Sequence, residues 1–331
     1  MTAQALGRTA RALWIVEAGR AELRAEPLQP PASGEVLVET SFSALSRGTE
    51  GLVFRGGVPA ELHASMRCPH QAGELSFPVK YGYCSVGRVR AGAAPIGQRV
   101  FCLFPHQDRY VVPAADVVEI PDAVPDRRAV LAANMETAIN GLWDAAPLVG
   151  SRVAVIGAGA VGLLAASLLA RIPGVELELV EIAAEKDALC AQLGLRCVRP
   201  AAARGDCDLV LHASGSPAGL ETALSLAGFE ATILELSWYG DRKVSLSLGG
   251  RFHNGRLRIL SSQVGSVAAS QRPRWSYRRR MQLALSLLTD ARYDALLSPP
   301  VPFETLPEAL PGLFQRAGST VTELVQYTPT A

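Results

Sequence analysis

A glycine-rich run in the middle of the chain constrains the fold more than any other feature. Residues 152–162 read Arg-Val-Ala-Val-Ile-Gly-Ala-Gly-Ala-Val-Gly. The apolar residues before the first glycine are typical of a buried parallel strand, and good helix formers follow the last one. Gly157 allows a tight turn, Gly159 lets the backbone approach a phosphate, and Gly162 lets the helix pack against the strand. The run predicts a dinucleotide pyrophosphate site whose contacts are Gly157, Gly159, Ala160, Val161 and Gly162.

An acidic residue lies where such a site needs one. The apolar stretch from Val175 to Val180 ends in Glu181, about 20 residues after the glycines. A carboxylate there accepts hydrogen bonds from the adenosine ribose diol, and its charge repels a 2′-phosphate. The sequence therefore favours NAD over NADP. The alternative is a glycine-rich turn in an unrelated α/β sheet.

A membrane-spanning helix is a second interpretation of the same region. Val153 to Ala170 carries no charge and is about as long as a short span. The glycine spacing and the Pro173-Gly174 turn favour a strand followed by a buried helix. The first twelve residues lack the apolar core of a signal peptide, so we expect a cytoplasmic protein.

Composition limits the classes of partner. The chain has 331 residues, 49% of them hydrophobic, and a net charge of +1. This length suits two domains, and the balanced charge gives no reason to expect nucleic acid or an acidic membrane surface. The six cysteines form no CxxC pair, so neither a disulfide framework nor a cysteine-rich zinc lobe is indicated. We expect a small-molecule substrate.

The hydrophobic pattern changes near residue 131. Before it, short strand-like segments are separated by Pro-Gly and Gly-Gly turns. After it, strands and helices alternate, which indicates an α/β unit with a doubly wound parallel sheet. The expected strands of this unit are 153–156, 176–181, 209–213, 231–236 and 257–261, and the expected helices are 161–171, 184–193, 218–227 and 278–288. The tail then predicts a short helix within 303–311 and a last strand over 322–327.

This arrangement resembles the medium-chain dehydrogenase/reductase family, to which the alcohol-dehydrogenase-like proteins belong. Residues 44–50, Ala-Leu-Ser-Arg-Gly-Thr-Glu, are similar to the family's Gly-Ile-Cys-Gly-Thr-Asp segment, and residues 82–87 are similar to its Gly-His-Glu-x-x-Gly segment. The resemblance implies a GroES-like β-barrel domain over 1–130 and 294–331 and a Rossmann domain over 131–293. It also implies a nicotinamide cofactor, an active site between the domains, and a homodimer.

The departures from the family pattern concern zinc. Ser46 stands where zinc-dependent members have cysteine, Tyr83 replaces the ligand histidine, and Cys84 replaces the next glutamate. The third ligand position falls near Asn134 or Glu136. Serine, tyrosine and asparagine do not form a zinc site, so we expect no catalytic metal; rescue by Cys84, Cys68, His70 or His106 is the alternative. Residues 261–265, Ser-Ser-Gln-Val-Gly, resemble the bacteriochlorophyllide and threonine dehydrogenase-like subgroup.

Without zinc, a side chain must polarise the substrate oxygen. Tyr83 is the first candidate, because the resemblance places it at a ligand position, and Lys80 could lower its pKa. The alternative is a packed aromatic side chain in the barrel. Glu136 is the second candidate, as a base or a contact for a polar substrate; otherwise it is a first-turn acid stabilised by the helix dipole. Ser46 and Thr49 are candidates for hydrogen bonds to substrate or to the nicotinamide ribose.

The remaining candidates line the expected cleft. Glu50 could bind substrate or pair with an arginine. Ser214 and Gly215 follow an expected strand on the path of the cofactor. Trp238 and Tyr239 follow the next strand and could form a wall for a planar substrate, or simply pack at the surface. His212 and His253 are interpreted as structural histidines.

The sequence therefore predicts a metal-independent, NAD-linked dehydrogenase that interconverts an alcohol and a carbonyl. Two alternatives stay open. One is a zinc-less quinone or enoyl reductase acting on a C=C bond, although such relatives often use NADPH. The other is a non-catalytic NAD-binding sensor or assembly subunit.

Overall fold

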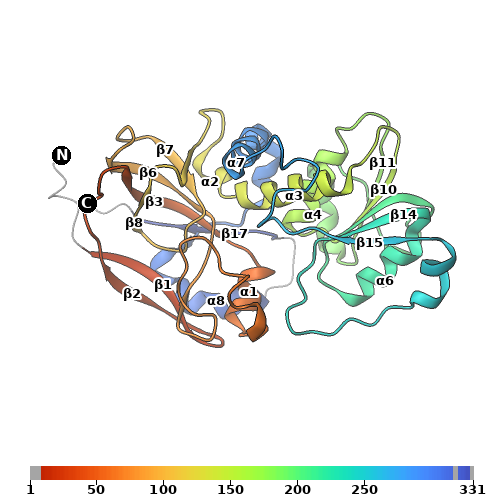
Figure 1. Ribbon diagram of the computed structural model, residues 1–331, viewed down its shortest axis with the longest axis horizontal. Coiled ribbons are helices and arrows are strands. Elements are labelled where there is room, and N and C mark those ends of the chain that lie inside the picture. The colour runs from red at the N-terminus through yellow and green to blue at the C-terminus, as the bar shows by residue number, and fades with distance from the viewer. Residues whose placement is uncertain (1–8, 316–319, 329–331) are drawn as a thin grey trace. The chain divides into compact units, whose positions relative to one another are not determined.

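The chain divides into two compact units. The computed structural model describes residues 9–315 and 320–328. The first unit comprises residues 1–133, 285–289 and 297–331, and the second comprises 134–284 and 290–296. Figure 1 labels helices and strands of both units.

The first unit contains two antiparallel β-sheets. The smaller has the order β2-β1-β5-β4, and the larger has the order β16-β17-β3-β6-β7-β9, with β8 also paired to β3. Alternating small apolar residues of β3 and its neighbours make one core, in which Phe104 and Tyr110 stack with ring centroids 3.8 Å apart. The strands are β1 (Thr9–Glu17), β2 (Arg20–Pro27), β3 (Glu35–Leu45), β4 (Ala72–Gly73), β5 (Val79–Lys80), β6 (Ser85–Gly92), β7 (Arg99–Cys102), β8 (Arg109–Pro113), β9 (Val117–Glu119), β16 (Val301–Pro302) and β17 (Glu323–Gln326).

The helices of this unit are short, and one of them carries candidate residues. α1 begins at Thr49, within the segment 44–50 that resembles the family's zinc site. Pro311 lies inside α8, so this helix continues beyond the short helix expected there. The helices are α1 (Thr49–Phe54), α2 (Asp126–Ala129) and α8 (Leu306–Gln315).

The second unit is built on a parallel sheet. Its order is β12-β11-β10-β13-β14-β15, and every neighbouring pair is parallel. The chain moves outward from β10 in one direction, returns, and continues from β13 in the other, so the switch point lies between these two strands. The strands are β10 (Arg152–Ile156), β11 (Glu176–Val180), β12 (Cys197–Val198), β13 (Cys207–His212), β14 (Ala227–Glu235) and β15 (Arg258–Ser261).

Helices connect these strands and cover the sheet, as the predicted alternation requires (Figure 1). Helix α4 follows the glycine run, and its small apolar residues pack against β10 and β11. The helices are α3 (Ala132–Ala145), which begins at the boundary between the units, α4 (Ala160–Leu169), α5 (Asp187–Gln192), α6 (Pro217–Leu226) and α7 (Tyr277–Ser286). The predicted α/β class is confirmed, and the expected strands are found within one or two residues at most ends.

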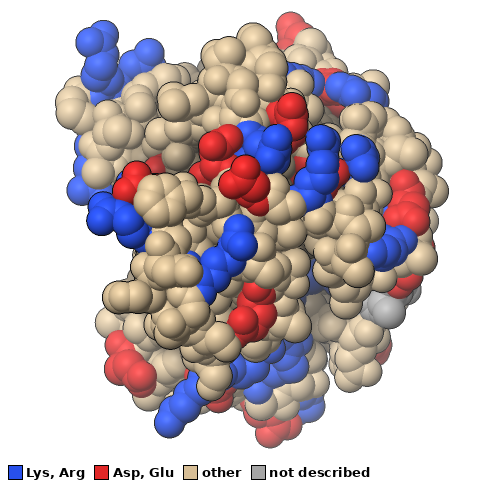
Figure 2. All heavy atoms as spheres, turned by 90° about the vertical axis from the view of Figure 1, so that its right-hand side faces the viewer, with Lys and Arg blue, Asp and Glu red and all other residues tan. Residues whose placement is uncertain are grey.

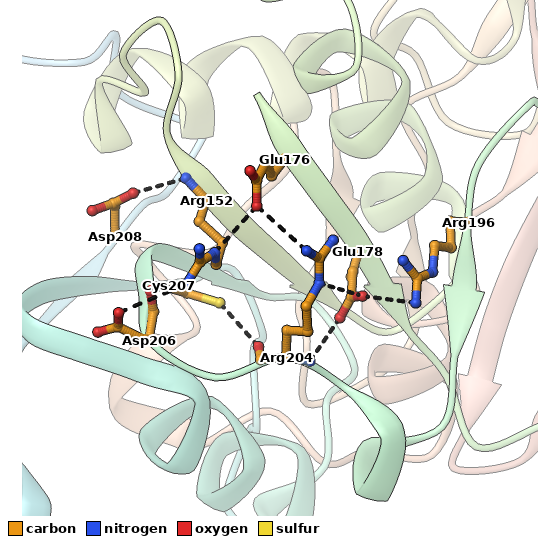
Figure 3. Close-up of polar contacts among 8 residues, drawn as sticks. All are labelled: Arg152, Glu176, Glu178, Arg196, Arg204, Asp206, Cys207 and Asp208. Carbon is orange, nitrogen blue, oxygen red and sulfur yellow. Dashed lines mark hydrogen bonds and ion pairs between the residues drawn. The ribbon is translucent and has the colours of Figure 1, made fainter. Parts of the chain in front are cut away.

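Charged side chains form a paired network where the parallel strands begin (Figure 3). Glu178 is 4% exposed and accepts hydrogen bonds from the backbone N–H and the guanidinium of Arg204, while Arg196 lies 3.3 Å away. Arg152 contacts Glu176 at 3.3 Å, and its backbone N–H donates to Asp208. These charged side chains pair with one another, so we interpret this edge of the sheet as a network that stabilises the fold.

The surface carries charges of both signs. On the face drawn in Figure 2, basic and acidic side chains lie side by side over the second unit. Within residues 9–315 and 320–328, each helix is too short or too polar to span a bilayer. The uncharged stretch 153–170 is accordingly strand β10 followed by helix α4.

Candidate functional site

The glycine turn lies at the switch point of the parallel sheet. Gly157 has φ +103°, and a Cβ there would lie 2.7 Å from the Cα of Ser214. A Cβ on Gly162 would lie 2.0 Å from the carbonyl oxygen of Gly157. A Cβ on Gly159, by contrast, would meet nothing within 4 Å. Two glycines are therefore required for packing, and the third leaves open space above the backbone, as a bound pyrophosphate requires.

The start of α4 faces this open space with backbone donors. Gly159 is the N-cap and makes no side-chain capping bond, so the first N–H groups of the helix, at Ala160 and Val161, receive no side-chain cap. Such a helix start favours an anion. Together with the open position at Gly159, these residues fit a dinucleotide.

Glu181 differs from the expectation. Its Oε2 accepts hydrogen bonds from Ala158 N at 2.8 Å and Lys186 Nζ at 3.0 Å, and its Oε1 accepts from the N–H groups of Ile182 and Ala183. Burial opposes ionisation, but these hydrogen bonds and the Lys186 charge outweigh it and lower the pKa of Glu181. The carboxylate is therefore ionised and already holds the glycine turn, instead of being free for a ribose diol.

Ser214 and Gly215 lie at the carboxyl end of β13, as expected. Ser214 is exposed, and its Oγ lies 2.7 Å from Nε2 of His212, which is completely buried. The backbone N–H of Gly215 donates to the Oγ of Ser237 at 3.0 Å. His212, interpreted from sequence as structural, thus contacts a predicted cofactor residue. Its position two residues before Ser214 at a strand end was the available signal.

The end of β14 completes this arrangement. Oε2 of Glu235 lies 2.8 Å from Nδ1 of His212, and the hydroxyl of Tyr239 donates a hydrogen bond to the same oxygen at 3.2 Å. Burial, followed by the charge of Glu235, raises the pKa of Tyr239. Trp238 is half-buried beside it. The hydroxyl of Tyr239 is therefore already hydrogen-bonded to Glu235. Only its aromatic ring is left for the expected role as a wall for the substrate.

In the first unit, the structure brings together Ser46, Glu50 and Tyr83. Tyr83 is half-buried and hydrogen-bonds Ser46 through their side chains. Burial raises the pKa of Tyr83 well above its usual value, and the charge of Glu50 adds to the effect. Tyr83 is therefore a neutral phenol that can donate a proton in a hydrogen bond, and it is not a tyrosinate base.

Glu50 is not free to bind substrate as expected. Its side chain is buried, its Oε1 accepts from Ser46 N at 2.8 Å, and its Oε2 lies 2.8 Å from Nε2 of His106. Nδ1 of His106 lies 2.7 Å from Ser43 Oγ, which in turn lies 3.0 Å from the hydroxyl of Tyr327. Glu50 thus pairs with a histidine, where the sequence suggested an arginine. Thr49 is the first residue of α1.

The expected partnership of Lys80 with Tyr83 is wrong. Lys80 Nζ contacts Glu26 at 2.6 Å and Gln107 at 2.8 Å. The pKa of Tyr83 is raised, whereas a nearby free ammonium would have lowered it. Lys80 is therefore an ion-pair partner in the smaller sheet.

Glu136 is also engaged. It is buried in α3, and its Oε1 accepts a hydrogen bond from Arg280 at 3.0 Å. Burial raises the pKa of Glu136 although the charge of Arg280 opposes this. Arg280 also donates to Asn140 and to backbone carbonyls. This carboxyl group thus serves an internal network of the second unit, and its expected role as a base has no support in these contacts.

The donor groups do not fit a zinc ion. Among the described residues, no three His, Cys, Asp or Glu side chains are placed to hold a metal. Burial raises the pKa of Cys84 well above its usual value and that of Cys68 to about 12, so both are neutral thiols in the metal-free protein. His106 is occupied by Glu50 and Ser43, and His70 pairs with Asp116 at 3.2 Å.

No model of a known protein family matches the chain. Curated relatives include the D-guloside 3-dehydrogenases of Escherichia coli (strain K12) and Shigella flexneri. Each is 23% identical over 309 residues, which cover 84% of this chain and 88% of the relative.

Solved structures of dehydrogenases match nearly the whole chain. L-Idonate 5-dehydrogenase from Escherichia coli K-12 superposes with a TM-score of 0.78 at 15% identity, covering 96% of this chain and 98% of its own. An alcohol dehydrogenase from E. coli CFT073, complexed with NADH, superposes with a TM-score of 0.76 at 16% identity and covers 97% of this chain and 100% of its own. A dehydrogenase from Sinorhizobium meliloti 1021, described as zinc-binding and bound to NADP, gives a TM-score of 0.77 at 18% identity and covers 97% of this chain and 100% of its own.

These comparisons confirm the predicted fold, and they agree with the predicted enzyme class, because these relatives are dehydrogenases. They do not distinguish the zinc-less subgroup. By its fold, the chain is similar to the dehydrogenases of known structure, with a GroES-like domain and a Rossmann domain.

Proposed function

We propose that the chain is a metal-independent, NAD-linked dehydrogenase that interconverts a secondary hydroxyl group and a ketone on a small polyol or glycoside. The observation that carries the proposal is the glycine turn. Gly157 and Gly162 have no room for a Cβ, while the space at Gly159 is open at the switch point of the parallel sheet. An unrelated glycine-rich turn would not need both properties in this order.

The residues that would hold the cofactor come from three strand ends. The turn after β10 receives the pyrophosphate, Glu181 after β11 lies toward the adenosine half, and Ser214 with Gly215 after β13 lies toward the nicotinamide half. Thr49 in the first unit is a further candidate for the nicotinamide ribose. When bound, the cofactor supplies the hydride chemistry.

The preference for NAD rests on the charge of Glu181. Its lowered pKa keeps the carboxylate ionised, and an ionised carboxylate disfavours a second phosphate nearby. Lys186, 3.0 Å away, offsets part of that charge. We therefore infer a preference for NAD that is moderate in size.

Tyr83 is our candidate for the proton donor. As a neutral phenol it donates a hydrogen bond to a developing alkoxide or to a carbonyl oxygen, and Ser46 orients it. This assignment needs no metal, in agreement with the donor groups around it. The alternative is that Tyr83 only packs against Tyr81, whose ring lies edge-on at 6.2 Å.

The substrate class is inferred from the relatives. The curated relatives are named for a dehydrogenation at position 3 of a guloside, and one structural relative acts on L-idonate. Both names denote polyhydroxylated molecules oxidised at a ring or chain hydroxyl. We infer a similar class for this chain.

The test combines binding with turnover. Purified protein should bind NADH, oxidise members of a panel of glycosides and polyols with NAD, and retain activity without stoichiometric zinc by elemental analysis. Tyr83→Phe should lower turnover by about 100-fold or more while the Kd for NADH is unchanged. Tyr81→Phe is the matched control and should retain activity.

Each alternative has its own outcome. NADH binding without turnover of any alcohol or ketone, unchanged in Tyr83→Phe, would identify a binding subunit. Products reduced at a C=C bond would identify an enoyl-type reductase. Stoichiometric, activity-linked zinc would contradict metal independence. The homodimer and the cytoplasmic location stay predictions.

A further inference from the structure

Three side chains at the carboxyl edge of the parallel sheet form a continuous hydrogen-bonded chain. Ser214 Oγ lies 2.7 Å from Nε2 of His212. On the other side of the imidazole, Nδ1 lies 2.8 and 2.9 Å from the two oxygens of Glu235. We call these three residues the open chain, because its first member is exposed and its histidine is completely buried.

Glu235 determines which imidazole nitrogen carries the proton. The backbone N–H of Ser237 donates to its Oε1 at 2.7 Å, and the hydroxyl of Tyr239 donates to its Oε2 at 3.2 Å. A carboxylate with such donors is an acceptor only, so the hydrogen between it and Nδ1 must belong to the imidazole. In the neutral form of His212, Nε2 is then unprotonated, and Ser214 donates its hydroxyl proton to it.

The hydrogen-bonding capacity of Ser214 is then almost used up. A serine hydroxyl has one proton and two lone pairs. The proton points to His212, and the backbone N–H of Ser216 donates to the oxygen at 3.2 Å. One lone pair is left, on an exposed residue. A ligand atom that meets Ser214 must therefore be a hydrogen-bond donor, which excludes an ionised phosphate oxygen and admits a hydroxyl.

The position of Ser214 selects the part of the cofactor. Its Cα approaches Gly157 so closely that a Cβ on the glycine would lie 2.7 Å away. β13 and β14 lie on the side of the switch point opposite to β11 and Glu181. In a doubly wound sheet the two halves of a dinucleotide divide across this point. The hydroxyl groups nearest Ser214 are then those of the nicotinamide ribose.

We propose that Glu235 and His212 are positioning residues that hold the Ser214 hydroxyl as a single acceptor for a ribose hydroxyl on the nicotinamide half of the cofactor. This inference rests on the proposed function. It goes beyond it by naming the direction of the hydrogen bond and the two buried residues that set it.

The binding experiment compares two ligands. We expect Ser214→Ala to weaken NADH binding by about 3- to 10-fold, measured by titration calorimetry, because one hydrogen bond is lost. Binding of ADP, which lacks the nicotinamide ribose, should be unchanged. Ser216→Ala is the matched control, since its side chain makes no capping bond to α6, and it should bind both ligands like the unaltered protein.

The outcomes separate this inference from the proposed function. If the unaltered protein binds NADH and Ser214→Ala binds it equally well, the inference is overturned and the proposed function stands. If Ser214→Ala weakens the binding of ADP as much as that of NADH, the assignment of Ser214 to the nicotinamide half of the cofactor is wrong. If the unaltered protein binds neither ligand, both the proposed function and this inference are wrong.

A second measurement tests the direction of the hydrogen bond without any ligand. The chain has five histidines, and the ring signals of His212 in a long-range proton–nitrogen spectrum can be assigned from their loss in His212→Gln. We expect the proton on Nδ1, whereas a proton on Nε2 would refute the proposed direction. Glu235→Gln keeps an oxygen acceptor for Nδ1 and should retain NADH affinity, while Glu235→Leu should lose it like Ser214→Ala. Full affinity in Glu235→Leu would overturn the positioning role.

Discussion

Each unit contains a serine, a histidine and a glutamate joined in a row, yet the two rows differ in which imidazole nitrogen faces the serine and in how exposed the serine is. In the first unit, Ser43 contacts Nδ1 of His106 and Glu50 contacts Nε2. We call these three residues the closed chain. Ser43 is 1% exposed, and its hydroxyl is covered by that of Tyr327 at 3.0 Å. In the open chain, the serine is exposed and one of its lone pairs has no partner within the unit.

This difference teaches that residue types and distances do not by themselves make a ligand site. In both rows the histidine nitrogens lie 2.7 and 2.8 Å from the serine and glutamate oxygens. The closed chain satisfies all its members internally, so its role is to stabilise the fold around Glu50 and, through it, the backbone of Ser46. The open chain ends at the surface beside the glycine turn, where a ligand can complete it.

The largest expected effect concerns stability. His106→Leu leaves Glu50 and Ser43 buried without their partner, which should lower the free energy of unfolding by about 3 kcal/mol. His212→Leu should cost about 1 kcal/mol, because Glu235 keeps its bonds from Ser237 and Tyr239. Urea unfolding of both variants measures the difference. Equal losses would remove the distinction between a closed and an open chain.

The next effect concerns binding. A Cβ on Gly219 in α6 would lie 2.2 Å from Ser214 Oγ and 2.7 Å from His212 Nε2. Gly219→Ala should therefore displace the serine hydroxyl and weaken NADH binding by about tenfold, although alanine is the better helix former. Gly205→Ala is the control, because its Cβ would meet nothing within 4 Å. Titration with NADH should separate the two variants; equal affinities would show that the open chain does not contribute to binding.

The smallest effect concerns the other half of the cofactor site. Lys186→Ala removes the cation that offsets Glu181 and frees part of Oε2, so the ratio of NADP to NAD dissociation constants should rise by about threefold. Lys243→Ala, an exposed lysine in the same unit, should leave the ratio unchanged. A fall in the ratio for Lys186→Ala would mean that Glu181 does not set the preference.

The glycine turn was predictable because its information is local. Gly157, Gly159 and Gly162 act within eleven consecutive residues, and their spacing follows from the geometry of one strand, one turn and one helix. The hydrophobic pattern likewise predicted the parallel sheet and the change of architecture near residue 131. Very short strands such as β4, β5 and β12 were missed, because two residues carry no period.

The state of the candidate side chains was not predictable. Lys80 pairs with Glu26, Glu136 pairs with Arg280, and Glu50 pairs with His106. These partners lie 54, 144 and 56 residues away in the chain. His212 was interpreted as structural, and its hydrogen bond to Glu235, which comes from the neighbouring strand, was equally hidden from the sequence.

The sequence by itself therefore determined the architecture of the chain and the place of the glycine turn, because both follow from local spacing and chemical identity. Only the tertiary structure decided which of its polar groups are already satisfied and which are left for a ligand. That decision depends on burial and on contacts between distant segments, since a polar group without water must find a partner in the fold.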